Sequence, residues 1–315
     1  MAKKENALAS VIQKFSAKRE LPRYEVRPQV LDDLWNGFHC GAIYSIWAEK
    51  GAGKSSLTFQ VIRSLCKKGL KGIFVDVEKA FNEFQQESFG LTEYIESGQL
   101  IVVTVSNWKD YEELVMALDE SDINFFVTDS VTMIMAYTPK ELKVEDVRPG
   151  LKAQQAASVL GKLKDISYRN EIGTILLYHA RANIQIVGAN PYASPTKMAG
   201  GMADAHIPDV ITKIQTHSKV KGEGDDPIGV EISIVCEKNK FTKPFQTRRE
   251  KLIFGKGIDP RLSLIEKAIE LGIIKQSGSS FIIPNHDNVR GRKALYELDA
   301  ETLRGIQQLV KENQE

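Results

Sequence analysis

The stretch Ala48-Glu49-Lys50-Gly51-Ala52-Gly53-Lys54-Ser55 decides the fold. It follows a short apolar run at 42–47 and precedes a segment, 55–67, whose apolar residues recur at helical spacing. The glycines let the backbone curl so that successive amide groups point at phosphate oxygens, and the start of the helix adds the positive end of its dipole. The stretch therefore predicts a phosphate-binding loop between a strand and a helix, although its first position is alanine where glycine is usual.

Each part of this loop has an expected contact with ATP and Mg²⁺. Lys54 is expected to reach the β- and γ-phosphates, and the Ser55 hydroxyl to ligate the metal. The residues predicted to surround the phosphates are Ala48, Glu49, Lys50, Gly51, Ala52, Gly53, Lys54, Ser55 and Ser56.

Two acidic positions come after apolar runs and complete the predicted hydrolytic site. Asp129 comes directly after the run at 124–128, where a carboxylate is costly unless a cation or solvent meets it, so we expect it to orient Mg²⁺. An acidic loop residue without a metal is the alternative. Asp76 and Glu78 end a second run, and the carboxyl ends of parallel strands form a ligand crevice. We predict that Glu78 is the catalytic base and that Asp76 is structural or capping.

The remaining pattern indicates an α/β fold. Continuous apolar strands separated by helices favour a parallel sheet covered on both faces, and the strands after residue 207 fit an antiparallel extension of it. The predicted strands lie at 42–47, 72–77, 100–105, 124–128, 173–178, 210–216, 229–236 and 251–254, the helices at 55–67, 111–118 and 151–168, and a polar loop at 218–227. A compact tail of helices and short strands comes last. We expect three parts: 1–28, a core at 29–257 and a small domain at 258–315.

Composition excludes several classes of protein. The chain has 315 residues, 42% of them hydrophobic and 26% charged, with a formal net charge of +1, as in ordinary globular proteins. Cys40, Cys66 and Cys236 have no metal-ligand spacing, and their odd number argues against a disulfide framework. The first residues do not read as a secretory signal, and no apolar run approaches the ~20 residues that span a bilayer. We expect a cytoplasmic protein with no membrane segment.

The first segment of the chain, 6–18, has apolar residues at helical spacing between lysines and glutamates. It predicts a short amphipathic helix whose apolar face packs either on a neighbouring subunit or on its own core.

Beyond the phosphate-binding loop, several motifs resemble the bacterial RecA recombinases over nearly the whole chain. They lie at 55–57, 74–80, 127–131, 188–191, 200–201, 238–240 with 244–245, 254–258 and 270–278. The resemblance implies a RecA-like P-loop NTPase core with a mostly parallel sheet and an antiparallel extension, a small α+β C-terminal domain, and an N-terminal helix that docks on the adjacent subunit of a helical homo-oligomer.

The resemblance also implies roles at the nucleotide. Glu78 matches the family's catalytic glutamate, and Lys238 and Lys240 match basic residues that reach a neighbour's γ-phosphate, an arrangement equivalent to an arginine finger. A solvated basic turn is the alternative for this pair. His179 stands where the family usually has a glutamine that senses γ-phosphate; the alternative is a structural histidine. Near the expected adenine position, Asn82 and Gln85 occupy the stretch that matches the family's aromatic platform, and Phe84 and Phe254 are the aromatic candidates.

DNA contacts are implied for two loops, at about 137–150 and 181–206. The second is rich in small residues, which let backbone amides meet phosphates, and its aliphatic residues suit wedging between bases. The residues predicted to contact DNA in and near these loops are Lys152, Arg181, Ile184, Ile186, Val187, Asn190, Lys197, Gly200 and Gly201. Gln154 and Gly161 stand where the family has arginines, with Lys152 as the candidate substitute. In the tail, Arg290, Arg292 and Lys293 suit capture of duplex DNA; a solvated charge run is the alternative.

Together these implications predict a DNA-dependent ATPase that polymerises on single-stranded DNA and promotes homologous pairing and strand exchange with duplex DNA. Two alternatives stay open: a recombination mediator or regulatory RecA-like ATPase without strand exchange, and a hexameric helicase-type motor.

Overall fold

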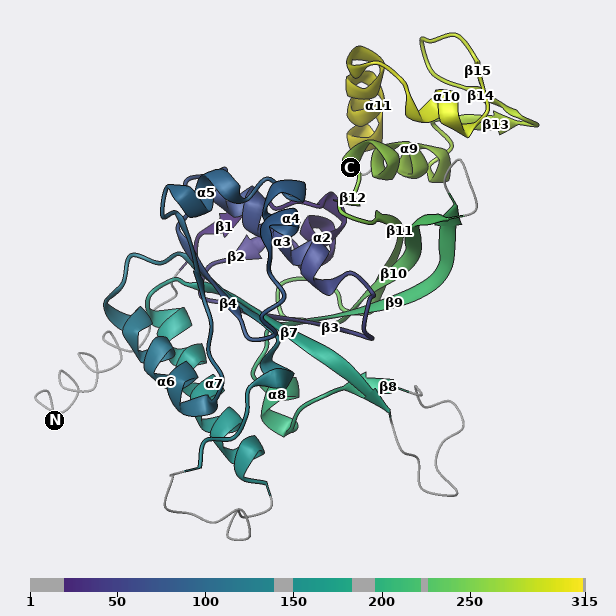
Figure 1. Cartoon of the computed structure of the whole chain (residues 1–315). Helices are drawn as coiled ribbons and strands as arrows, with labels where there is room; N and C mark the ends of the chain where they lie inside the picture. Colours follow the sequence, from purple (N-terminus) through teal and green to yellow (C-terminus); the bar gives the residue numbers. More distant parts are fainter. Residues whose placement is uncertain (1–19, 139–149, 183–195, 222–225, 314–315) are drawn as a thin grey trace, which may run out of the picture.

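The structure is a computed structural model of the chain, and it describes residues 20–138, 150–182, 196–221 and 226–313 (Figure 1). The helix predicted over 6–18 and most of the loop predicted over 137–150 lie outside these residues. So does the segment 183–195 of the second predicted loop.

One ten-stranded sheet organises the core (Figure 1). Its order is β12-β11-β10-β9-β3-β7-β6-β4-β5, with β8 paired to β7; the neighbours from β9 to β5 are parallel, and the pairs made by β8, β10, β11 and β12 are antiparallel. The predicted mostly parallel sheet with an antiparallel extension is confirmed. The strands are β3 (Ile43–Ala48), β4 (Gly72–Asp76), β5 (Leu100–Val103), β6 (Phe125–Asp129), β7 (Gly173–Ala182), β8 (Thr196–Met198), β9 (Val210–Lys221), β10 (Pro227–Asn239), β11 (Gln246–Ile253) and β12 (Gly257–Ile258).

Helices cover both faces of this sheet (Figure 1). One face carries α2 to α5, the other α6 and α7, and the short α8 comes after β8. Their bounds are α2 (Gln29–Trp35), α3 (Lys54–Cys66), α4 (Glu83–Ser88), α5 (Thr92–Glu96), α6 (Trp108–Ala117), α7 (Leu151–Arg169) and α8 (Met202–His206); a two-stranded ribbon of β1 (Arg23–Tyr24) and β2 (Phe38–His39) precedes β3.

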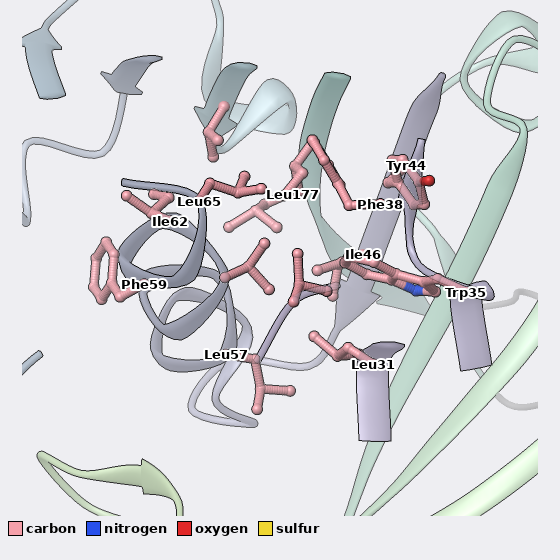
Figure 2. Packing of buried hydrophobic residues seen from close by; sticks show 14 of the residues in the cluster. Leu31, Trp35, Phe38, Tyr44, Ile46, Leu57, Phe59, Ile62, Leu65 and Leu177 are labelled. Atoms are coloured by element: carbon pink, nitrogen blue, oxygen red, sulfur yellow. The ribbon is translucent and has the colours of Figure 1, made fainter. Parts of the chain in front are cut away.

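The core beneath α2 and α3 fixes where the phosphate-binding loop lies (Figure 2). Leu57 of α3 and Trp35 of α2 are fully buried with Ile46 of β3 and Leu177 of β7. The indole Nε1 of Trp35 donates a hydrogen bond to the Thr212 hydroxyl at 2.9 Å, so its polar atom is satisfied inside the apolar cluster. Because α3 is held on the sheet in this way, its first turn stands directly at the carboxyl end of β3.

The hairpin of β9 and β10 is longer than the sequence predicts. The loop predicted at 218–227 is wrong at both ends, because ladder pairing reaches Lys221 and Pro227. Strand β11 likewise begins at Gln246, five residues before the predicted start at 251. These extensions carry mainly polar side chains that are all at least partly exposed, so backbone hydrogen bonds hold the strands without the apolar alternation on which a sequence pattern depends.

The C-terminal segment has its own apolar cluster, separate from the two clusters that lie on the two faces of the central sheet. Ile265, Phe281, Leu295 and Ile306 are buried in it. Its elements are α9 (Pro260–Glu270), β13 (Lys275–Ser277), β14 (Ser280–Ile282), β15 (Val289–Arg290), α10 (Arg292–Tyr296) and α11 (Ala300–Glu312). Within the described ranges, no helix is both long enough and apolar enough to cross a membrane.

Candidate nucleotide site

The loop after β3 has the backbone that phosphate binding needs. Gly51 and Gly53 have φ angles of 80° and 87°, in the left-handed region that favours glycine. A Cβ atom at Gly53 would lie 2.3 Å from Cδ1 of Leu252, so a side chain there would have to displace the Leu252 side chain of β11. Lys54 begins α3, and its Nζ donates to the Glu49 carbonyl at 3.4 Å. The loop thus curls around its own lysine at a helix N-terminus, an arrangement suited to anions.

Asp129, at the end of β6, meets this loop. Its carboxylate accepts a hydrogen bond from the Ser55 hydroxyl at 2.5 Å, and the residue is 7% exposed. Burial raises the pKa of Asp129 to about 6, which outweighs the opposite effects of Ser55 and Lys54. Burial also lowers the pKa of Lys54, although Asp129 and Glu78 act in the other direction.

The donor set of Ser55 and Asp129 fits Mg²⁺. A hydroxyl and a carboxylate are hard oxygen ligands of the kind this ion prefers, and it usually keeps waters and phosphate oxygens as its other ligands. The described residues contain no cluster of three or more acidic, His or Cys side chains that could hold a metal alone. The site therefore suits a metal that arrives with a phosphate group.

Glu78 is held beside Asp129 by its backbone. The amide groups of Val77 and Glu78 donate to the Asp129 carbonyl at 2.8 and 3.3 Å. The Asp76 carboxylate accepts from the amides of Ala80 and Phe81 at 3.2 and 3.0 Å and so closes the turn that carries Glu78. Asp76 has the capping contacts that the sequence predicts for it.

His179 lies against Glu78. Its Nε2 is 2.7 Å from Oε1 of Glu78, although the two residues are 101 positions apart in the chain. His179 pairs with Ala48 across the parallel ladder of β7 and β3, which places it next to the first residue of the loop. Its backbone amide donates to Thr132 Oγ1 at 3.4 Å, a supporting residue for which the sequence gives no signal. Four parallel strands thus bring Lys54, Ser55, Asp129, Glu78 and His179 to one edge of the sheet.

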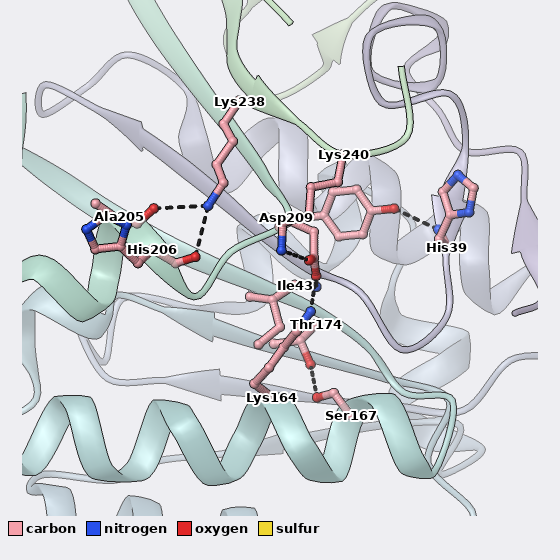
Figure 3. A network of polar contacts seen from close by, with 11 residues as sticks. His39, Ile43, Lys164, Ser167, Thr174, Ala205, His206, Asp209, Lys238 and Lys240 are labelled. Carbon is pink, nitrogen blue, oxygen red and sulfur yellow. Dashed lines mark hydrogen bonds and ion pairs between the residues drawn. The ribbon is translucent and has the colours of Figure 1, made fainter. Parts of the chain in front are cut away.

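Lys238 and Lys240 lie at the other edge (Figure 3). Lys240 Nζ is 2.9 Å from Oδ1 of Asp209, whose other oxygen accepts from the Ile43 amide at 2.9 Å and from Lys164. Ile43 is the first residue of β3, and the phosphate-binding loop follows the last residue of that strand. The two edges are thus ~17 Å apart at a rise of about 3.3 Å per residue. Lys240 and its partner Asp209 therefore lie about the length of β3 away from the loop of their own subunit, and Lys238, which pairs with Ile211 opposite Ser45, lies nearer to it.

The charges around Asp209 are satisfied. Burial alone would raise the pKa of this carboxyl, but the hydrogen bonds from Lys164, the Ile43 amide and Lys240 together hold its pKa below the ordinary value. Lys238 Nζ donates to the carbonyls of Ala205 and His206 at 3.3 and 2.9 Å, so this lysine is tied to the end of α8.

Some of the residues predicted to contact DNA lie within the described part of the chain, and others lie outside it. Lys152 Nζ donates to the Thr132 carbonyl at 2.8 Å, and Arg181 to the Gly200 carbonyl at 3.0 Å. Arg181 pairs with Lys197 across β7 and β8, and both line a cavity of about 660 Å³ together with Gly200 and Gly201. Ile184, Ile186, Val187 and Asn190 lie outside the described residues.

The three residues of the predicted basic cluster in the C-terminal segment differ in their surroundings. Arg292 forms an ion pair with Glu266 and donates to the Tyr296 hydroxyl at 3.1 Å, so part of its charge is used within the C-terminal segment. Arg290 is exposed on β15, and the side chain of Lys293 is not described.

Comparison with known proteins identifies the family. A family model described as the RecA N-terminal domain matches residues 34–259, which include the loop, β4, β6, β7 and both lysines. The chain belongs to the RecA family. Proteins named RecA from Thermus aquaticus, Chloroherpeton thalassium and Aquifex aeolicus are 25%, 27% and 28% identical to it over 277, 280 and 248 residues. These matches cover 88%, 88% and 77% of this chain and 78%, 76% and 68% of the relatives. The family predicted from the sequence motifs is confirmed.

Proposed function

We propose that this RecA-family chain is a DNA-dependent ATPase that assembles as a helical filament on single-stranded DNA. The filament would catalyse homologous pairing and strand exchange with duplex DNA, in recombination and repair in the cytoplasm. The observation that carries the proposal is the edge of the sheet where Lys54, Ser55, Asp129 and Glu78 meet. There Lys54 and Asp129 are buried, and burial shifts the pKa of each towards its neutral form, beside a loop shaped for phosphates.

Each residue of this edge has a role in the proposed hydrolysis of ATP. Lys54 and the loop amides bind the phosphates, and Ser55 and Asp129 hold Mg²⁺, which would neutralise phosphate charge. Glu78 orients or deprotonates the attacking water, since its carboxylate is partly exposed next to the loop. His179 keeps that carboxylate in place through its hydrogen bond.

We also propose that the site is completed by a second copy of the chain. Lys238 and Lys240 lie towards the amino end of β3, away from the loop at its carboxyl end, so we assign them to a neighbour's nucleotide; to reach it they would exchange their present contacts with Asp209 and the end of α8 for contacts with phosphate. Cations placed at transferring phosphate stabilise its charge in the transition state. ATP would thus bind subunits together, and hydrolysis would loosen them; the segment 1–28 adds a docking helix to the same assembly.

For DNA we propose two surfaces. The first would hold single strands at the cavity beside β7 and β8, through Arg181, Lys197, Gly200, Gly201, Lys152 and the loop residues Ile184, Ile186, Val187 and Asn190. Its basic residues are few, and Gln154 and Gly161 add no charge. The second would capture duplex DNA on the C-terminal segment 258–315, through Arg290, Arg292 and Lys293.

Electron microscopy with single-stranded DNA and a non-hydrolysable ATP analogue tests the proposal. Helical filaments that also yield joint molecules with homologous duplex DNA are the expected result, and Lys54→Ala, which removes the phosphate contact, should form none. Closed rings would instead support a helicase-type motor. Filaments that never yield joint molecules would support a mediator or regulatory ATPase.

A further inference from the structure

The turn that carries Lys240 is held by contacts that do not involve the lysine amine. The side-chain oxygen of Asn239 accepts from the backbone amides of Phe241 and Thr242 at 2.7 and 3.1 Å, which closes the turn. The side-chain nitrogen of Asn239 donates to the Leu34 carbonyl of α2 at 2.9 Å. The backbone of the turn is therefore fixed to α2, whereas the side chain of Lys240 is 54% exposed.

The next side chain of this turn stacks on a histidine that is distant in the sequence. The Phe241 ring lies over the His39 imidazole, with ring centroids 4.0 Å apart and planes 9° from parallel. Phe241 is partly buried and packs against the apolar cluster beneath α2 and α3. An aromatic pair shifts an equilibrium by about two- to ten-fold beyond the effect of the area that it buries. The stack is therefore a second attachment of the turn, independent of Asn239.

The imidazole of His39 is itself held in place. Its Nε2–H donates to the Asn36 carbonyl at 2.9 Å, since a carbonyl oxygen can only accept. The backbone amide of His39 donates to the Tyr44 hydroxyl at 2.7 Å (Figure 3). His39 also pairs with Arg23 in the ribbon of β1 and β2. The stack thus joins the lysine turn to the ribbon that precedes β3.

The contacts of the turn differ in how a phosphate group would affect them. Lys240 Nζ is 2.9 Å from a carboxylate oxygen of Asp209, and a phosphate can replace this carboxylate because both are anions that accept from an ammonium group. The stack of Phe241 on His39 and the hydrogen bonds of Asn239 involve no cationic donor that a phosphate could take over. They can therefore stay in place while the amine changes its partner.

We propose that His39 is a positioning residue. By stacking on Phe241, it holds the turn so that Lys240 can move from Asp209 to a phosphate of the nucleotide on a neighbouring subunit. Only the lysine side chain has to rotate, so less conformational entropy is lost when the amine binds phosphate than if the whole turn became ordered. This inference rests on the proposed completion of the site by a second copy of the chain.

Assembly of the whole chain with ATP and single-stranded DNA, followed by light scattering, tests it. His39→Ala should raise the protein concentration needed for assembly about two- to ten-fold, the contribution of one aromatic pair. The Kd of ATP for dilute, unassembled protein, measured by calorimetry, should not change, because His39 precedes β3 and the loop follows it. His39→Phe keeps an aromatic face over Phe241 and should assemble as wild type does.

Adding His39→Ala to Lys240→Ala separates positioning from packing. If the stack acts through Lys240, the second change should raise the required concentration by less than about two-fold, because no amine is left to position. A histidine with a purely structural role would add its full effect in both backgrounds. His286 provides the matched control, since it is an exposed histidine of the C-terminal segment, and His286→Ala should assemble as wild type does.

Three results would overturn the inference and leave the proposed function standing. They are unchanged assembly in His39→Ala, a His39→Phe variant that assembles as poorly as His39→Ala, and an equal loss with and without Lys240. Failure of wild type to assemble on single-stranded DNA with ATP would overturn the proposed function as well, which separates the two outcomes.

Discussion

The two edges of the central sheet hold carboxylates that are equally buried but differ in every contact. Asp129, at the carboxyl edge, and Asp209, at the amino edge, are 7% and 5% exposed. Asp129 accepts one side-chain hydrogen bond, from Ser55, and its pKa is raised to about 6. Asp209 accepts from one backbone amide and two lysines, and its pKa is lowered.

The difference shows how a ligand site can be recognised in a structure without the ligand. At the amino edge the chain satisfies its own charges, so these contacts contribute to folding. At the carboxyl edge burial works against both Asp129 and Lys54, and no described contact compensates them fully. Removing the carboxylate charge should therefore mainly cost function at Asp129 and mainly cost stability at Asp209.

The largest effect is expected for Glu78→Ala. Loss of a general base typically lowers turnover by about 10²–10⁴-fold, whereas ATP binding should remain because the loop and Asp129 are intact. Phosphate release and ATP binding are measured on the same preparation. Glu113→Ala removes the same kind of side chain from an exposed position on α6 and should behave as wild type. Unchanged turnover in Glu78→Ala would refute the assigned role.

Lys238→Ala should separate assembly from binding. We expect the protein concentration needed for ATP-dependent assembly to rise about ten-fold or more, since a cation facing the neighbour's phosphate is lost. ATP binding by dilute, unassembled protein should not change. Light scattering and calorimetry supply the two readouts. An equal loss in both, or in neither, contradicts a role across the subunit interface.

The paired substitutions Asp129→Asn and Asp209→Asn compare the edges directly. Asp209→Asn should lower the free energy of unfolding by about 1–3 kcal/mol, because a buried charge network loses its anion. Asp129→Asn should leave it unchanged or raise it, since the amide keeps the shape without an uncompensated charge. Urea denaturation at pH 8 without nucleotide measures both; equal losses would mean that the edges do not differ as described.

A smaller effect is expected at Glu250, a carboxyl group of β11 in contact with the C-terminal segment. It accepts from the Ser263 hydroxyl at 2.8 Å, and burial raises its pKa to about 7, with a further contribution from Glu266. The folded state thus binds this proton more tightly than the unfolded chain, and the stabilisation present below pH 4.5 is lost as pH rises through about 7.

Glu250→Gln cannot ionise and keeps that stabilisation. The gain in free energy of unfolding over wild type should therefore be larger at pH 8 than at pH 4.5, by about 1 kcal/mol. This difference is modest because the carboxyl group is only partly buried. Denaturation at the two pH values measures the difference. A difference that does not change with pH would show that this carboxyl group titrates normally.

Local chemistry is the part of the molecule that the sequence could predict. The curled loop is predicted by its glycines and its lysine, and the strands that end in Asp76 and Asp129 are predicted by continuous apolar runs with an acidic residue at the end of each. The polar extensions of β9 and β10 could not be found in this way, because exposed ladders leave no periodic signal.

Pairings between distant residues were also invisible. His179 and Glu78 each end a predicted strand, but only the order of strands in the sheet determines that they touch. Lys240 reads as a basic turn until folding brings it to Asp209. A single sequence carries no record of such partners.

Placing the loop and the two lysines at opposite ends of β3 gives any chain of these subunits a direction. Under the proposed assembly, one terminal subunit offers lysines to no nucleotide, and the other holds a nucleotide that no lysine reaches. A row of n subunits then has n − 1 complete sites, so short oligomers are poor catalysts for a geometric reason alone. Turnover per subunit would rise with length, which makes hydrolysis a gauge of how far polymerisation has gone.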